Sequence, residues 1–312
     1  MLYIKNVNNS NGDNNMNYTI FSKIMNKYFN NQTFHSPTDK VIESSKTIKK
    51  KYKYPCKIQE EISIDYHTFI FHHYNIKANK ILLYFPGGSF IDPPTVLHYK
   101  YAKKIAKKLN LHVIMVQYPL FPEIDPYSTA TLIIKILKHK NINDLLLMGD
   151  SAGANLACFV LQCLHDSNLN YVKKAILISP FIDKSLNNKK ICLIRQYDFV
   201  LNYENCKALV EKVFKPILKE NQNLFPDNNT FRFNSDILMI SGQKEIFTPD
   251  IRIWCQNERK LNIKHMIYKD MCHCFPIVPC KQANDCIKNM KIFINKHWHF
   301  LPVTYNINKN DY

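Results

Sequence analysis

A five-residue motif, Gly-Asp-Ser-Ala-Gly at residues 149–153, constrains the fold of this chain more than any other segment. It follows the apolar run 145–148 and precedes the small, apolar stretch 154–157, so it is expected to join a buried strand to a helix. A serine at such a turn takes a positive φ, and glycine is needed two positions away on each side because strand and helix pass very close. The motif therefore predicts that Ser151 presents its hydroxyl, with the N–H of Ala152 free at the helix start.

A glycine-rich loop upstream supplies the context that this short pattern needs. The apolar run 80–85 predicts a buried strand that leads directly into Pro86-Gly87-Gly88-Ser89-Phe90. Such a loop can turn backbone N–H groups toward a bound oxygen. The chain has only 6 glycines, and four of them lie in these two motifs. A further strand over 112–118 ends in the sequence Tyr-Pro-Leu-Phe-Pro-Glu at 118–123.

The ordered motifs PGGSF, YPLFPE and GDSAG resemble those of the hormone-sensitive-lipase-like branch of the α/β-hydrolase fold. Members of that branch usually show HGGG, YRLAPE and GDSAG at comparable separations, and residues 57–298 fit the plan. The resemblance implies an α/β fold with a mostly parallel central sheet flanked by helices. It also implies a helical cap made by the N-terminal segment and by an insertion after the sixth core strand.

The chain departs from this family at the oxyanion-type loop. Pro86 stands in place of the usual histidine and Ser89 in place of the third glycine, and the arginine of YRLAPE is absent. Proline cannot supply the side-chain hydrogen bonds that normally brace the loop, whereas Ser89 keeps its backbone N–H. These changes bear on rate and substrate preference more than on reaction class. Glu123, at the end of YPLFPE, is expected to brace its loop.

Two downstream residues are expected to complete the site in the order nucleophile, acid, base. After the predicted strand 236–242, the family pattern places the acid at Glu245, three residues beyond a glycine, and Asp250 is the alternative. Asp250 has a structural explanation, because Thr248-Pro249-Asp250 has the form of a helix start with a hydroxyl N-cap. The base is His273, on a loop between the predicted strand 263–268 and an amphipathic helix that follows.

These residues predict a serine hydrolase that cleaves carboxylic esters of short or medium acyl chains through an acyl-enzyme. His273 would act as base for Ser151, Glu245 would orient it, and the N–H groups of Gly88, Ser89 and Ala152 would hold the oxyanion, with Gly87 shaping their loop. Two alternatives remain, an amidase resembling arylformamidases and a ligand-binding module without turnover. The partner is a small-molecule ester, and no cofactor or metal is expected.

The composition narrows the remaining possibilities. The net charge is +17, and the lysine-rich segment 46–57 is the best local candidate for weak contact with an anionic membrane surface. A general bias toward lysine and asparagine explains this charge better, and the sequence carries no nucleic-acid-binding module. The 10 cysteines are scattered and no secretory leader is evident, which favours the cytoplasm. A zinc site at His273 with Cys272, Cys274, Cys280 and Cys286 is disfavoured by their spacing.

Length and pattern predict one core with added segments. Residues 1–55 form a partly mobile N-terminal segment, with a helix over 21–29 that contributes to a cap. Residues 56–180 and 233–300 form the hydrolase core, 181–232 a lid insertion that includes a helix over 203–218, and 301–312 a tail. Strands over 58–64 and 68–74 open the sheet antiparallel, and a helix over 97–109 follows the glycine-rich loop. The sequence leaves the oligomeric state and the natural substrate open.

Overall fold

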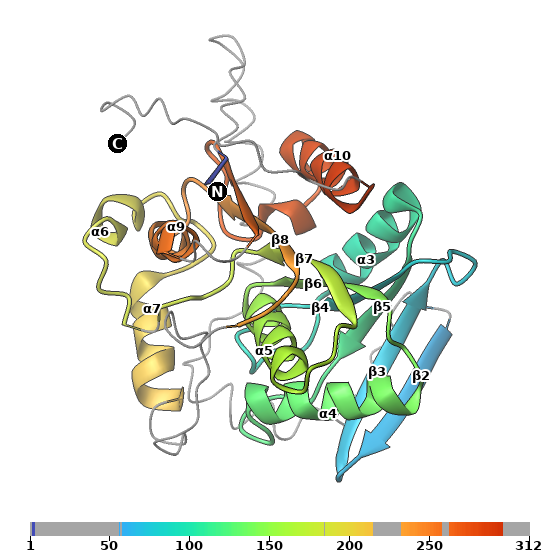
Figure 1. Ribbon diagram of the computed structural model, residues 1–312. Coiled ribbons are helices and arrows are strands. Elements are labelled where there is room, and N and C mark those ends of the chain that lie inside the picture. The colour runs from blue at the N-terminus through green and yellow to red at the C-terminus, as the bar shows by residue number, and fades with distance from the viewer. Residues whose placement is uncertain are drawn as a thin grey trace.

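The chain folds around one twisted sheet of nine strands (Figure 1). The computed structural model describes residues 2–3, 56, 58–183, 185–214, 232–257 and 262–295. The strands lie in the order β1-β9-β8-β7-β6-β4-β5-β3-β2. Their bounds are β1 Leu2–Tyr3, β2 Ile58–Ile64, β3 His67–Tyr74, β4 Ile81–Phe85, β5 His112–Gln117, β6 Leu145–Asp150, β7 Val172–Ile178, β8 Asp236–Gly242 and β9 Ile263–Tyr268.

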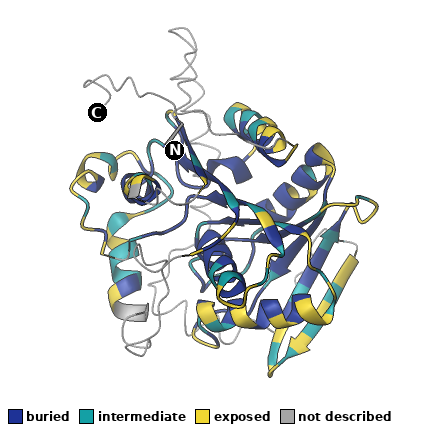
Figure 2. Cartoon of the chain, viewed as in Figure 1, coloured by how far each residue is buried: buried dark blue, intermediate teal, exposed yellow. Residues whose placement is uncertain are grey.

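The predicted antiparallel opening of the sheet is confirmed. β2 and β3 form a hairpin whose turn, Asp65 and Tyr66, has positive φ at both residues, and β3 also pairs antiparallel with β5. The remaining pairs are parallel. The central strands are buried, whereas the outer hairpin exposes many side chains (Figure 2). Continuous apolar runs such as Ile81–Phe85 suit parallel strands because helices cover both faces of the sheet.

Helices form a layer on each face of the sheet. On one side, α3 (Val96–Leu109) and α10 (Lys281–Asn295) pack side by side into a single core cluster (Figure 1). On the other side, α4 (Pro126–His139), α5 (Ala152–Asp166) and α9 (Thr248–Asn257) contribute to a second cluster. The local sequence explains where α4 begins, because the Asp125 side chain accepts hydrogen bonds from two N–H groups of the first turn and proline follows it.

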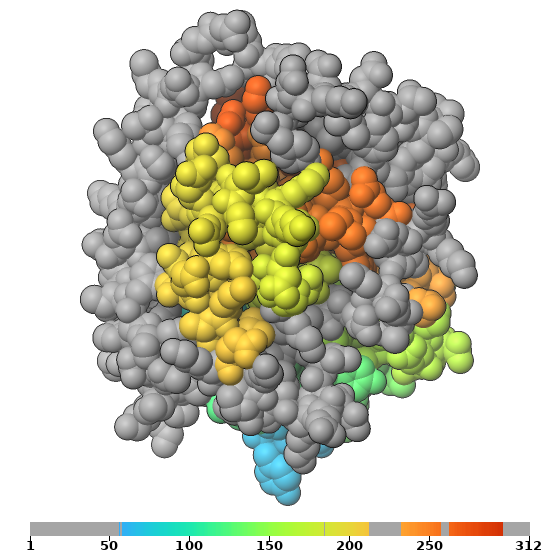
Figure 3. All heavy atoms as spheres, turned by 90° about the vertical axis from the view of Figure 1, so that its left-hand side faces the viewer, coloured from blue at the N-terminus to red at the C-terminus, as the bar shows by residue number. Residues whose placement is uncertain are grey.

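The predicted insertion follows β7, which is the sixth of the strands counted from Ile58. Its described part contains α6 (Ile191–Ile194), α7 (Tyr203–Ala208) and the π-helical turn η1 (Leu209–Phe214). It forms a continuous surface mass, yellow in Figure 3, beside the orange C-terminal part of the core. The predicted helix over 203–218 is confirmed in its described part, 203–214, but its hydrogen bonding changes along the way, since the α-helix ends at Ala208 and wider π-helical turns follow.

Several predictions fall on other parts of the chain. Of the predicted N-terminal segment 1–55, only Leu2–Tyr3 is described, and it forms the edge strand β1 rather than part of a cap. The helix over 21–29, the basic segment 46–57 (apart from Cys56) and the tail 301–312 lie outside the described residues. The domain boundaries stay predictions. All ten cysteines are described and are free thiols, and the cytoplasmic location stays a prediction. Among the described residues, no helix is both long and apolar enough to cross a membrane.

The sheet register brings the predicted site residues to one edge. Phe85 at the end of β4 pairs with Gly149 of β6, and Gly149 pairs with Leu177 of β7. The loops that leave β4, β6, β7, β8 and β9 therefore emerge together at the carboxyl end of the parallel strands. This is the edge where ligands bind in open α/β sheets.

Candidate active site

Ser151 occupies a sharp turn between β6 and α5. Its φ of 51° and ψ of −124° lie outside the helical and extended regions, and its N–H donates to the carbonyl of Ile178 at 2.8 Å. A Cβ at Gly149 would approach the carbonyl oxygen of Gly153 to 2.2 Å, and one at Gly153 would approach that of Phe85 to 2.1 Å. Glycine is required at both positions because backbone, which cannot move aside, fills the space. The expected strained elbow is thus present.

His273 lies directly beside Ser151. It follows β9 on the loop before the short turn η2 (Phe275–Ile277), and its Nε2 is 3.0 Å from the Oγ of Ser151. The ring is buried and meets Phe247 edge to face with 5.3 Å between centroids. Burial lowers the pKa of His273 to about 4, because the charged imidazolium loses its hydration. The ring is therefore neutral at pH 7 and able to accept the hydroxyl proton.

Glu245 is the carboxylate on the far side of this ring. Its Oε2 lies 3.8 Å from Nδ1 of His273 and accepts hydrogen bonds from the Ser179 hydroxyl at 2.7 Å and the Gly242 N–H at 3.2 Å. Both Nδ1 of His273 and Oε1 of Glu245 are buried without a hydrogen-bond partner in the described part of the chain. The 3.8 Å between Oε2 and Nδ1 is longer than a hydrogen bond, and catalytic hydrogen bonds are often long in the absence of substrate. Burial raises the pKa of Glu245 well above its usual value.

The alternative acid, Asp250, has a different partner. Its Oδ1 accepts a hydrogen bond from the amide of Asn188 in the insertion at 2.7 Å, and burial raises its pKa to about 6. The expectation that Thr248 caps α9 is wrong. The helix begins at Thr248 itself, whose hydroxyl donates to the carbonyl of Gly242. This hydroxyl therefore ties the start of α9 to the end of β8, in the loop that carries Glu245.

The loop after β4 has the geometry that its glycines predict. Gly88 has a φ of 142°, and a Cβ there would lie 2.2 Å from the carbonyl oxygen of Asp92. Ser89 follows at a φ of 54°. No hydrogen bond of the described chain uses the N–H of Gly88 or Ser89. Ala152 opens α5, whose first N–H groups have no acceptor within the helix. All three candidate oxyanion donors are thus available.

Asp150 is a site residue that the sequence reasoning did not single out. Its buried carboxylate accepts hydrogen bonds from the Tyr84 hydroxyl, from the N–H of Gly87 at 3.2 Å and from Nε2 of His98 at 3.3 Å. Nδ1 of His98 accepts the Thr95 N–H at 2.9 Å, so its proton is on Nε2. Asp150 directly precedes Ser151, so its carboxylate connects the elbow to the glycine-rich loop. Its position inside the GDSAG motif was the available signal.

The position of Pro86 is braced by this network and by one further bond. The Tyr118 hydroxyl donates to the carbonyl of Pro86 at 2.8 Å. A Cβ at Gly87 would lie 2.7 Å from Oδ2 of Asp150, so glycine is needed for the carboxylate to approach. Bonds from Tyr118 and Asp150 to the backbone thus hold a loop whose first residue has no polar side chain.

The insertion contributes Asp198, a second residue that the sequence analysis missed. Its Oδ2 accepts the N–H of Ile246 at 2.9 Å, and its Oδ1 accepts those of Val200 and Leu201. Burial raises its pKa to about 6. Because Ile246 directly follows Glu245, this carboxylate fixes the insertion to the loop of the candidate acid. Nothing in its sequence surroundings marks Asp198.

A thiol also touches the candidate base. Sγ of Cys274 lies 3.4 Å from Nε2 of His273, and the pKa values of Cys272 and Cys274 are raised by burial, which keeps both thiols protonated. Among the described residues, no three His, Cys, Asp or Glu side chains are placed to hold a metal ion.

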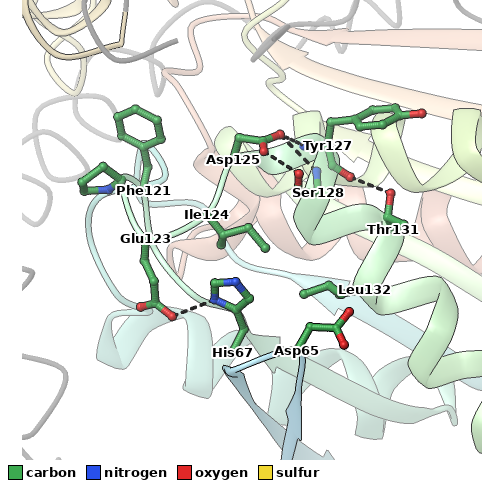
Figure 4. A pocket seen from close by; sticks show the side chains of 11 residues that line it. Asp65, His67, Phe121, Glu123, Ile124, Asp125, Tyr127, Ser128, Thr131 and Leu132 are labelled. Carbon is green, nitrogen blue, oxygen red and sulfur yellow. Dashed lines mark hydrogen bonds and ion pairs between the residues drawn. The ribbon is translucent and has the colours of Figure 1, made fainter. Parts of the chain in front are cut away.

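A cavity of about 490 Å³ lies apart from these residues, between the β2–β3 turn and the start of α4 (Figure 4). Nδ1 of His67 and Oε1 of Glu123 meet across it at 3.0 Å, which joins the YPLFPE loop to β3. Its carboxylates at Asp65, Glu123 and Asp125 each have a partner within the protein. The cavity does not include Ser151, Glu245 or His273 among its lining residues.

Comparison with known proteins identifies the family. Residues 82–277 match the family model described as the alpha/beta hydrolase fold, and the chain belongs to this family. An esterase of Acinetobacter venetianus is 25% identical over 200 residues, which cover 60% of this chain and 64% of that esterase. A triacylglycerol lipase of Mycobacterium tuberculosis is 28% identical over 103 residues, covering 31% of this chain and 23% of that lipase. The chain thus spans less than two thirds of the length of either relative.

Solved structures share the fold. An esterase/lipase from an uncultured bacterium superposes with a TM-score of 0.70 at 18% identity, covering 89% of this chain and 97% of the other. A hormone-sensitive lipase from a metagenome library gives a TM-score of 0.69 at 16% identity with the same coverage. The predicted α/β-hydrolase fold is confirmed.

Proposed function

We propose that the chain is a serine hydrolase that cleaves carboxylic esters of short or medium acyl chains through an acyl-enzyme intermediate. The observation that carries the proposal is the distance of 3.0 Å between Oγ of Ser151, held at a strained elbow, and Nε2 of the neutral, buried His273. A hydroxyl is a weak nucleophile unless a base within hydrogen-bond reach accepts its proton. The names of the relatives, esterase and triacylglycerol lipase, favour an ester substrate.

In the proposed first half-reaction, His273 takes the proton of Ser151 as the oxygen attacks the ester carbonyl. The N–H groups of Gly88, Ser89 and Ala152 stabilise the negative charge on the carbonyl oxygen. The tetrahedral intermediate then collapses, and the imidazolium returns the proton to the departing alcohol. Glu245 stabilises the imidazolium from the Nδ1 side, where its carboxylate already lies within 3.8 Å.

In the second half-reaction, water replaces the alcohol. His273 takes a proton from the water as it attacks the acyl-serine, and the same three N–H groups hold the second oxyanion. Release of the carboxylic acid returns the proton to Ser151. The lone pair of Nε2 must be free at the start of each half-reaction, which the lowered pKa of His273 provides.

A fluorophosphonate probe tests the nucleophile, and a series of p-nitrophenyl esters of increasing acyl length tests the substrate. We expect covalent labelling at Ser151, none in Ser151→Ala, and full labelling in the control Ser63→Ala, whose hydroxyl lies on the exposed β2–β3 hairpin. Turnover should be greatest for short or medium chains. Labelling that persists in Ser151→Ala would refute the nucleophile, and faster cleavage of an aryl formamide than of the matched ester would favour the amidase.

A further inference from the structure

The outer side of the α3–α10 layer carries an unusual concentration of lysine. Lys100, Lys103 and Lys107 follow one another along the exposed side of α3, joined by Lys104 and Lys108. This helix contains no acidic residue. On α10, Lys281, Lys288 and Lys291 are exposed and the one acidic residue is Asp285. We call the exposed sides of these two adjacent helices the α3–α10 face.

In the part of the chain that the structure describes, the lysines of this face have no carboxylate partner. Within the described part of the chain, none of the eight takes part in an ion pair. The opposite layer differs, because Lys135 of α4 pairs with Asp65 and the adjacent Lys140 pairs with Glu60. Ion pairs thus offset part of the basic charge on the α4 side of the sheet, whereas those of the described chain leave all eight lysines of the α3–α10 face unpaired.

Apolar side chains are exposed in the same two rows. Val96 is 49% exposed at the start of α3, and it precedes Lys100, Lys103 and Lys107 at helical spacing. Ile292 is 42% exposed on α10, four residues after Lys288. The aromatic residues of α3, Tyr99 and Tyr101, point into the core. The face thus combines free lysines with isolated aliphatic groups and offers no exposed aromatic ring.

We propose that the α3–α10 face binds an anionic lipid surface. This proposal rests on the proposed function, because ester substrates of low solubility collect at lipid surfaces. The ammonium groups of the lysines attract acidic lipid headgroups, and the flexible aliphatic stems let them reach those headgroups. Val96 and Ile292 can then contact the boundary between the headgroups and the acyl chains. Proteins that bind nucleic acids favour arginine forks and aromatic stacking, and the α3–α10 face has neither. The lipid surface is therefore the partner that this chemistry fits.

Two variants of equal net charge test the proposal. The face variant combines Lys100→Gln, Lys103→Gln, Lys107→Gln and Lys288→Gln. The control variant combines Lys77→Gln, Lys138→Gln, Lys173→Gln and Lys189→Gln, four exposed lysines elsewhere on the described surface without an ion pair. Each protein is sedimented with phosphatidylcholine vesicles that contain phosphatidylserine, at low and at physiological salt. Hydrolysis of a soluble p-nitrophenyl ester is measured on the same preparations.

Each lysine at such a surface is worth about fivefold (about 1 kcal/mol). We therefore expect the face variant to bind the vesicles about 600-fold more weakly than the wild type if all four lysines contact the surface, and at least about 25-fold more weakly if two do. The control variant should stay within about threefold, and binding should weaken with salt. Equal losses in both variants, or no loss in the face variant, would overturn the proposal. Tighter retention by single-stranded RNA than by vesicles at the same salt would also overturn it.

The soluble-ester assay separates this proposal from the proposed function. Both variants should hydrolyse the ester at the wild-type rate, because the replaced lysines lie outside the candidate active site. A wild-type protein that binds vesicles as expected but does not cleave the ester would refute the proposed function and leave the docking face supported. A protein that cleaves the ester but shows no lysine-dependent vesicle binding would refute the docking face alone.

Discussion

Replacing Asp150 with asparagine should weaken the active site without changing its shape. The buried carboxylate accepts three hydrogen bonds, from Tyr84, Gly87 and His98. An amide of the same size can keep its oxygen toward Gly87 and His98 and turn its NH₂ toward the Tyr84 hydroxyl, which can then accept. The change thus removes the charge and reverses the bond to Tyr84, and its effect comes mainly from the lost strength of charge-assisted bonds.

The magnitude follows from the number of bonds. Hydrogen bonds to a charged group contribute about 1.5–3 kcal/mol and neutral ones about 0.5–1.5 kcal/mol, a difference of about 1–1.5 kcal/mol per bond, so three weakened bonds cost about 3–4.5 kcal/mol in the free energy of unfolding. At about 1.5 °C per kcal/mol for a chain of 312 residues, we expect the melting temperature to fall by roughly 5–7 °C. Because Gly87 precedes the candidate oxyanion donor Gly88, kcat should fall about 10- to 100-fold. This decrease in kcat is smaller than the roughly 10²- to 10³-fold that complete removal of one oxyanion donor costs, because Gly88 keeps its N–H.

Differential scanning fluorimetry and steady-state hydrolysis of p-nitrophenyl acetate measure the two effects. The control is Asp166→Asn, at an exposed carboxylate near the end of α5, which should leave both quantities unchanged. An Asp150→Asn enzyme with wild-type kcat and a lowered melting temperature would show that the network stabilises the fold without positioning the oxyanion loop. An unchanged melting temperature would refute the energetic argument itself.

The candidate acid and base give two further predictions. Glu245→Gln should lower kcat about 10³- to 10⁴-fold, because the imidazolium loses its counter-charge. Asp250→Asn should change kcat less than about threefold, because this carboxylate bonds to Asn188 instead. A larger loss of kcat in Asp250→Asn than in Glu245→Gln would assign the acid to Asp250. For pH dependence, His273 must be neutral to accept a proton, and burial lowers its pKa to about 4, so the ring should stay neutral until pH falls through about 4. The imidazole signals of His273, followed by NMR, should titrate near that pH, and a midpoint near 6.5 would contradict this burial argument.

Much of the site could be predicted from sequence because its constraints are local. The elbow needs glycine at positions 149 and 153, and the contacts that require it are made by residues close in sequence or in the adjacent strand. The apolar runs predict the central strands, and the order of serine, acid and histidine narrows the candidates to a few residues. The predicted helix boundaries are less accurate where hydrogen bonds to other elements decide them. At Thr248, for example, the hydroxyl donates to the carbonyl of Gly242 at the end of β8.

The sequence by itself thus determined the elbow at Ser151, the glycine-rich loop and the strand-helix order, since each depends on neighbours a few residues away. The family pattern favoured Glu245 over Asp250, and the tertiary structure showed that Glu245 lies beside His273 whereas Asp250, five positions later, bonds to Asn188. Only the tertiary structure brought Asp150, His98 and Asp198 to their loops from distant segments. The physical reason is that partner choice for a buried charge depends on the sheet register and loop packing, and no local pattern encodes these distances.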